Sequence, residues 1–151
     1  MLDHIDRKLI GLLQEDGRLT NAELADAVGL SQSACHRRVK RLEETGVISG
    51  YGAFVDRKRV GLTVLGYVSV KMERHDEETL GAFVRGVEAI DEIVACYAIS
   101  GGGDYLLKVV AEDMDAYAAV SLKKLSRLPG VKDSQSTFVL STVKLEQSWP
   151  I

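Results

Sequence analysis

The chain has 151 residues, 46% of them hydrophobic and 27% charged, and its formal net charge is −3. This length suffices for one ordinary domain or two small ones, and the composition is that of a globular protein. The negative balance excludes a protein coated with positive charge, so a surface that binds nucleic acid must be local. No apolar run reaches membrane-spanning length and no signal-peptide pattern opens the chain, so we expect a cytoplasmic protein without a membrane partner.

Residues with catalytic or metal-binding chemistry are sparse and scattered. The two cysteines, Cys35 and Cys96, lie far apart, and the three histidines form no cluster in the sequence. We therefore expect both cysteines to be small core residues in a reducing compartment, with neither a metal nor a cofactor. The chain offers no nucleophile beside a base, no paired carboxylates and no phosphate-binding glycine loop, so it does not read as an enzyme.

The first fifty residues carry the pattern of three helices, the first of them capped by Asp3. Thr20 begins the second helix, and Glu23 follows at the spacing of a capping box. Gly29 comes directly after that helix, where a left-handed backbone is needed, and Ser31 caps the third. The expected apolar stripe of the first helix is Ile5, Leu9, Leu12 and Leu13. Together these signals predict a helix–turn–helix domain over residues 1–49.

The third predicted helix has two unlike faces. Cys35, Val39 and Leu42 recur at helical spacing and predict an inward stripe, while the opposite side is basic. A helix–turn–helix uses such a second helix to enter the major groove of double-stranded DNA. The residues expected at base edges are Gln32, Ser33, His36 and Arg37, and those expected at phosphates are Arg38, Lys40 and Arg41. The alternative is a solvated basic face on an ordinary helical hairpin, and the capped turn with its glycine favours DNA.

Residues 50–60 read as an extended linker, and the pattern from residue 61 to residue 151 is that of a second domain. Its strands are expected in Val64–Met72, Glu92–Ile99, Tyr105–Ala111 and Thr137–Leu140. Its helices follow Asp76 and Asp113, with apolar stripes at Leu80, Phe83, Val84 and Val87 and at Met114, Tyr117, Ala118, Leu122 and Leu125. The order is βαββαβ, a ferredoxin-like α+β fold with both helices on one face of an antiparallel sheet. Because the other face also carries apolar residues, we expect a homodimer formed through the sheets.

Four segments now resemble the Lrp/AsnC, or feast/famine, family of transcription regulators. They are LDHIDRKLIGLLQEDGR, NAELADAVGLSQSACHRRVKRLEETGVISGY, SGGGDYLLKV and LPGVKDSQSTFVLSTVK, in the family's order and over nearly the whole chain. The resemblance implies a sequence-specific DNA-binding regulator with a winged or plain helix–turn–helix. It also implies a second domain that binds a small effector, usually an amino acid, and dimers that assemble to tetramers or octamers.

The resemblance also carries an effector site onto this chain. The family's Gly-x-x-Asp-Tyr loop matches Gly101, Gly102, Gly103, Asp104 and Tyr105, and a second part of the pocket matches Ser134, Gln135 and Ser136. Asp104 would neutralise the ammonium of an amino acid, and glycine N–H groups would hold its carboxylate. Family members often carry a larger residue at a middle position of this loop, so here we expect a more flexible and roomier loop. The alternative is a plain hairpin turn, for which glycine and aspartate are ordinary residues.

Two other functions remain open. One is a DNA-architectural protein that responds to no ligand. The other is an enzyme similar to the siroheme decarboxylases, whose two-domain architecture resembles this one. Against the enzyme, His75 is the only histidine of the second domain, and no cluster of arginines is present to hold the carboxylates of a tetrapyrrole.

Overall fold

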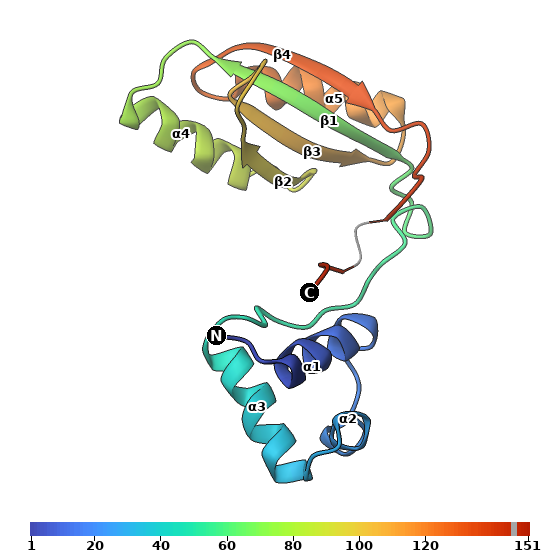
Figure 1. Ribbon diagram of the computed structural model, residues 1–151. Helices are drawn as coiled ribbons and strands as arrows, with labels where there is room; N and C mark the ends of the chain where they lie inside the picture. Colours follow the sequence, from blue (N-terminus) through green and yellow to red (C-terminus); the bar gives the residue numbers. More distant parts are fainter. Residues whose placement is uncertain (146–147) are drawn as a thin grey trace. The chain divides into compact units, whose positions relative to one another are not determined.

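The computed structural model describes residues 1–145 and 148–151, which divide into two compact units (Figure 1). The helical unit comprises Met1–Phe54 together with Lys144–Ile151, and the sheet unit comprises Val55–Val143. The chain therefore passes between the units twice. The division differs from the expected second domain at residues 144–151, of which residues 146–147 lie outside the described part. None of the described helices is long and apolar enough to span a bilayer.

The helical unit contains α1 (His4–Glu15), α2 (Asn21–Val28) and α3 (Gln32–Glu44). Each helix begins at its predicted cap, because the side chains of Asp3, Thr20 and Ser31 each accept a backbone N–H three residues later. A cap of this kind contributes about 1 kcal/mol to helix stability. Gly29 ends α2 with φ of 71°, a left-handed conformation that suits glycine. The turn between α2 and α3 is therefore set by local chemistry.

The three helices bury one small apolar core. The inward face predicted for α3 is confirmed, since Cys35, Val39 and Leu42 are buried. On α1 the buried apolar residues are Leu9 and Ile10, whereas Ile5, Leu12 and Leu13 are only partly covered. Within described residues 1–54, no strand follows α3.

The sheet unit has the predicted βαββαβ order. Its elements are β1 (Val64–Met72), α4 (Glu77–Glu88), β2 (Ile93–Ala98), β3 (Tyr105–Ala111), α5 (Met114–Lys123), a 3₁₀ turn η1 (Leu125–Arg127) and β4 (Val131–Phe138). The strands lie side by side in the order β2-β3-β1-β4, and every neighbouring pair is antiparallel (Figure 1). This topology confirms the ferredoxin-like fold.

Both helices cover the same face of the sheet. Alternate residues of the two central strands, Val68 on β1 and Leu107 on β3 among them, join Phe83 of α4 and Tyr117 of α5 in one buried cluster. The predicted stripes are wrong at four exposed positions, Val84, Met114, Ala118 and Leu122, while Val120 is buried. Leu122 lies five residues after Tyr117, about 140° around the helix, and so points away from the sheet.

The last strand begins earlier than predicted. β4 runs over Val131–Phe138, and Leu140, expected in a strand, is 97% exposed and lies beyond it. β4 is an edge strand with mostly polar, exposed residues, so it lacks the apolar alternation by which strands are recognised. The expectation for Cys96 was also wrong. This thiol is exposed on the edge strand β2, whereas Cys35 is buried.

Candidate nucleic-acid interface and effector loop

α3 presents one long polar face to solvent. Because its apolar stripe is buried against the other two helices, the opposite side is left open. The predicted DNA contacts that are exposed on it are Gln32, Ser33, His36, Arg37, Lys40 and Arg41. At about 100° per residue these positions span about half of the helix circumference. The surface is therefore continuous and has the width of a groove-binding face.

Two of the predicted phosphate contacts are tied to α1 instead of standing free. Arg38 Nη1 lies 2.7 Å from Asp3 Oδ2 and 2.9 Å from Asp6 Oδ1. Arg41 Nη2 lies 2.6 Å from Asp6 Oδ2. The Asp6 side chain is 1% exposed and receives both guanidinium groups. These ion pairs fasten α3 onto the start of α1, a role that the sequence analysis did not assign to Asp6.

The carboxylates in this cluster are held in their charged forms. Burial alone would raise the pKa of Asp6, but hydrogen bonds from Arg38 and from the Asp3 backbone N–H, with the charge of Arg41, bring it below its ordinary value. Hydrogen bonds from the Asp6 backbone N–H and from Arg38 lower the pKa of Asp3 to about 2. Asp3 and Asp6 also cap α1 reciprocally, each accepting the other's backbone N–H. The buried carboxylate of Asp6 thus both caps the start of α1 and holds α3 against it.

His36 and Lys40 of α3 make only exposed contacts. His36 Nδ1 lies 3.3 Å from Asn21 Nδ2, and Lys40 Nζ lies 3.7 Å from a carboxylate oxygen of Glu44. Exposed pairs of this kind contribute little to stability. Arg37 is exposed on the same face. These side chains are free to exchange their present contacts for a ligand.

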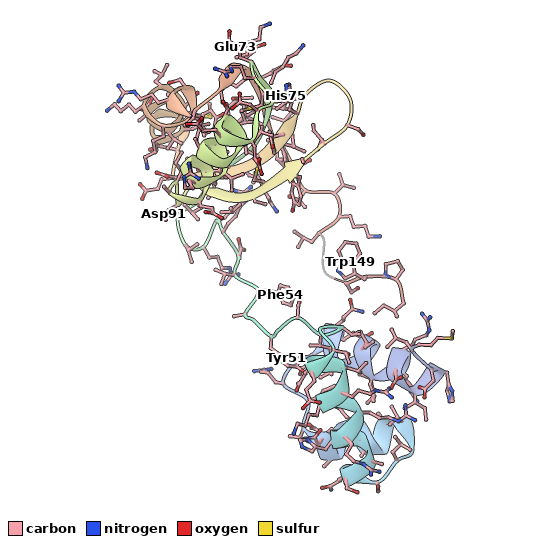
Figure 2. All side chains as sticks on the ribbon, turned by 90° about the vertical axis from the view of Figure 1, so that its left-hand side faces the viewer. Tyr51, Phe54, Glu73, His75, Asp91 and Trp149 are labelled. Atoms are coloured by element: carbon pink, nitrogen blue, oxygen red, sulfur yellow. The ribbon has the colours of Figure 1, made fainter. Side chains whose placement is uncertain are left out.

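The glycine loop joins β2 to β3, and Asp104 fastens it to the sheet. The Asp104 N–H donates to the Val70 carbonyl at 2.8 Å, and its own carbonyl accepts the Ile99 N–H at 2.9 Å. Its carboxylate accepts the Met72 N–H at 2.7 Å and lies 3.0 Å from His75 Nε2. The Met72 N–H, followed by His75, lowers the pKa of Asp104. Figure 2 labels His75, which the sequence analysis considered only as evidence against an enzyme.

The three glycines of the loop are not interchangeable. Gly101 has φ of 121°, which side chains rarely tolerate. A Cβ at Gly103 would overlap Ser69 Oγ and lie 3.2 Å from the Val70 carbonyl oxygen, whereas a Cβ at Gly102 would meet open space. Of the two middle glycines, Gly102 therefore faces open space, whereas Gly103 is packed against β1. Only the Gly102 position admits a side chain at no steric cost.

This difference gives a paired prediction. We expect Gly103→Ala to lower the stability of the sheet unit by about 1 kcal/mol, because the added methyl must displace Ser69 and push on β1. Gly102→Ala is the matched control and should leave stability unchanged. Thermal unfolding followed by circular dichroism measures both, and the first variant should melt about 4–8 °C lower. Equal melting temperatures for the two variants would show that the loop does not pack as described.

The β4 residues assigned to the effector pocket lie on opposite faces of the sheet. Ser136 points to the helices, where its hydroxyl forms a hydrogen bond with the Tyr117 hydroxyl. Because neighbouring residues of a strand point to opposite faces, Gln135 points to the other face of the sheet. Ser134 lies in the same row of the sheet as Tyr105, with one β1 residue between them, about 10 Å apart by strand spacing. The Tyr105 ring packs against that of Phe83 on α4, with 4.6 Å between the ring centroids. Ser134 and Ser136 thus lie on the helix-covered face of the sheet, whereas Gln135 lies on the other face, paired with Ser69 beside Gly103 of the loop.

Both parts of the chain match known families. Residues 65–149 match the Lrp/AsnC ligand binding domain, and residues 2–49 match a winged helix-turn-helix DNA-binding domain. The leucine-responsive regulatory protein of Escherichia coli strain K12 is 40% identical over 143 residues, which cover 95% of this chain and 87% of that protein.

Solved structures agree over nearly the full length. The crystal structure of a transcriptional regulator from Neisseria meningitidis in complex with L-methionine has a TM-score of 0.94 and 38% identity, covering 99% of this chain and 97% of that one. An AsnC family transcriptional regulator from Agrobacterium tumefaciens has a TM-score of 0.92 and 37% identity, with the same coverage. With a ligand-binding and a DNA-binding domain in this order and a relative 40% identical, the chain belongs to the Lrp/AsnC family of transcription regulators, and not to a family of enzymes.

Proposed function

We propose that the protein binds a specific operator through α3 and that an amino acid bound at the glycine loop changes this binding. The observation that carries the DNA part is the exposed polar face of α3, backed by a buried stripe and fastened to α1 through Asp6. Such a helix is preorganised to enter the major groove, because its seating does not depend on the DNA. Because the proposed target is DNA, we propose that the protein acts in the cytoplasm.

The residues of α3 divide into three roles. Arg37 stands exposed and is proposed to read base edges, with Gln32, Ser33 and His36 beside it, since arginine is the usual partner of guanine. Lys40 is proposed to neutralise a phosphate. Arg38 is half-buried between two carboxylates, so we assign it to holding α3 in place, and Arg41 is shared between Asp6 and the phosphate backbone.

This division predicts different losses for two basic residues. Arg37→Ala is expected to cost about 1–3 kcal/mol on the operator and little on random DNA, because the base contact is lost. Lys40→Ala should weaken both DNAs alike and reduce the salt dependence by about one released counterion. Fluorescence anisotropy with labelled operator, competed by random DNA at two salt concentrations, separates these outcomes.

The matched control is Arg18→Ala, which removes an exposed arginine of the same unit outside α3. This variant should bind both DNAs as the unaltered protein does. The roles assigned to Arg37 and Lys40 would be wrong if both variants lost the same factor on operator and on random DNA.

For the effector we propose a branched-chain or sulfur-containing amino acid. The Neisseria relative was crystallised with L-methionine, and the Escherichia coli relative is named for its response to leucine. In this chain the Asp104 side chain is 30% exposed, and its two oxygens retain acceptor capacity beyond Met72 and His75. It can therefore receive an ammonium while still holding the loop, and the N–H groups of Gly101 and Gly102 are suited to a carboxylate.

The uncovered face of the sheet supports a dimer. Across the strands, Tyr97 of β2 opposes Leu106 of β3, which opposes Ser69 of β1, all on the face away from the helices. Tyr97 is 53% exposed in the single chain. We propose that a second copy buries this face and that the two-fold pair presents two α3 helices to half-sites about 34 Å apart. Assembly to a tetramer or octamer is proposed from the family alone.

A further inference from the structure

The helical unit has a cleft of about 310 Å³ that is lined in part by the far end of the sequence. Ile10, Leu13 and Gln14 of α1 form one wall, and residues 47–52 with Phe54 form another. Trp149 and Ile151 complete the lining. Figure 2 labels Trp149 with Tyr51 and Phe54, which come from the segment after α3. Residues separated by the whole sheet unit in sequence therefore line one cleft.

Gln14 holds Trp149 by its peptide group. The Trp149 N–H donates to Gln14 Oε1 at 2.7 Å, and Gln14 Nε2 donates to the Trp149 carbonyl at 3.2 Å. A primary amide paired in this way satisfies both the donor and the acceptor of one residue, as a neighbouring strand would. The indole itself is 73% exposed. The contact therefore recognises backbone more than side chain, and two exposed hydrogen bonds are weak enough to be released.

The contact with Trp149 lies on α1, the helix to which α3 is held by ion pairs. Gln14 and Asp6 are both on α1, eight residues or about 12 Å apart. Asp6 in turn binds Arg38 and Arg41 of α3. On the other side, only a short segment separates Trp149 from β4, which ends at Phe138 and carries part of the proposed effector site. The chain thus has a route from β4 to α1 that does not use the linker after α3.

We propose that residues 148–151 dock on α1 as a second tether, and that this tether carries the effect of the effector to α3. The regulatory half of this statement rests on the proposed function, whereas the docking itself does not. A single linker would leave the helical unit free to turn about its attachment. A second attachment at Gln14 restricts that freedom, and its release or strengthening alters how the helical units can meet DNA.

The docking is tested with Trp149, the single tryptophan of the chain. In the full-length protein, without DNA or amino acid, Gln14→Ala should lower the fluorescence anisotropy of Trp149. It should also speed hydrogen exchange at the Trp149 amide about tenfold, the factor expected for a lost hydrogen bond. Alanine is the best helix former, so α1 is retained. Glu15→Ala, at the exposed neighbouring position, is the control and should change neither signal. Unchanged anisotropy and exchange in Gln14→Ala would overturn the docking.

The coupling is tested with a chain that ends at Ser148. This variant should lose the shift in operator affinity that an amino acid pool causes in the full chain, because the contact between Gln14 and Trp149 can no longer form. If the docking is present and the shortened chain keeps the full shift, the coupling is overturned. If the full chain itself shows no shift, the proposed effector response fails together with the coupling, while the exchange and anisotropy results still decide the docking.

Discussion

Replacing Asp6 by alanine is expected to destabilise the helical unit by about 3 kcal/mol, because both partner arginines lose a buried counter-charge. The loss is expected at the low end of the range for broken buried ion pairs, because Arg41 is half exposed and can regain water. The substitution also removes one half of the capping box with Asp3. Urea denaturation followed by circular dichroism should show the helical transition moved to lower urea, and operator affinity should fall with it.

Asp26→Ala is the matched control, because it removes an exposed carboxylate from α2 and should change stability by less than about 0.5 kcal/mol. The sign of the pH dependence gives a second check. The pKa of Asp6 lies below its ordinary value of 3.8, so its contribution is complete above pH 3.8 and is lost as the pH falls through the lowered pKa. The gap between the unaltered protein and Asp6→Ala should therefore close in acid. A gap that stays constant would mean that the carboxylate charge does not seat α3.

The second large effect is expected from Leu106→Glu on the uncovered face of the sheet. Leu106 is only partly buried in the single chain, so the monomer should keep its fold. In the proposed dimer the new carboxylate would be buried without a partner, which costs several kcal/mol and should yield monomers. Because two linked DNA-binding helices gain avidity, operator affinity should fall by at least about tenfold. Sedimentation velocity measures the first change and anisotropy the second.

Val84→Glu provides the control, since Val84 is an exposed apolar residue of α4, outside the sheet. It should leave both the oligomeric state and the DNA affinity unaltered. If Leu106→Glu sediments as the unaltered protein does, the second copy does not bind through this face of the sheet.

Local signals in the sequence predicted the helix–turn–helix and the order of the elements well. Thr20 and Gly29 fix the ends of α2 through contacts within a few residues, and such contacts can be read from spacing alone. The same holds for the inward stripe of α3, whose period follows from helix geometry. The helical period also places the exposed residues of the candidate DNA interface on the side of α3 opposite that stripe.

What the sequence did not reveal depends on pairs that are distant along the chain. Asp6 meets Arg38 only after three helices have packed, and His75 meets Asp104 only after β1 and β3 have paired. The Gln14–Trp149 contact spans 135 positions. The early start of β4 was missed for a different reason, since an exposed edge strand shows no apolar alternation. The partners in these three contacts are brought together only by tertiary structure, so no periodic pattern in the sequence reveals them.

The most direct test of the central claim is fluorescence anisotropy with the DNA upstream of the protein's own coding region. It is compared with random DNA of equal length at two salt concentrations, with and without a pool of amino acids. We expect tighter binding to the upstream DNA and a shift in that affinity when the pool is present, and splitting the pool then identifies the effector. Equal binding to both DNAs, with no response to any amino acid, would contradict a ligand-responsive regulator and favour an architectural protein.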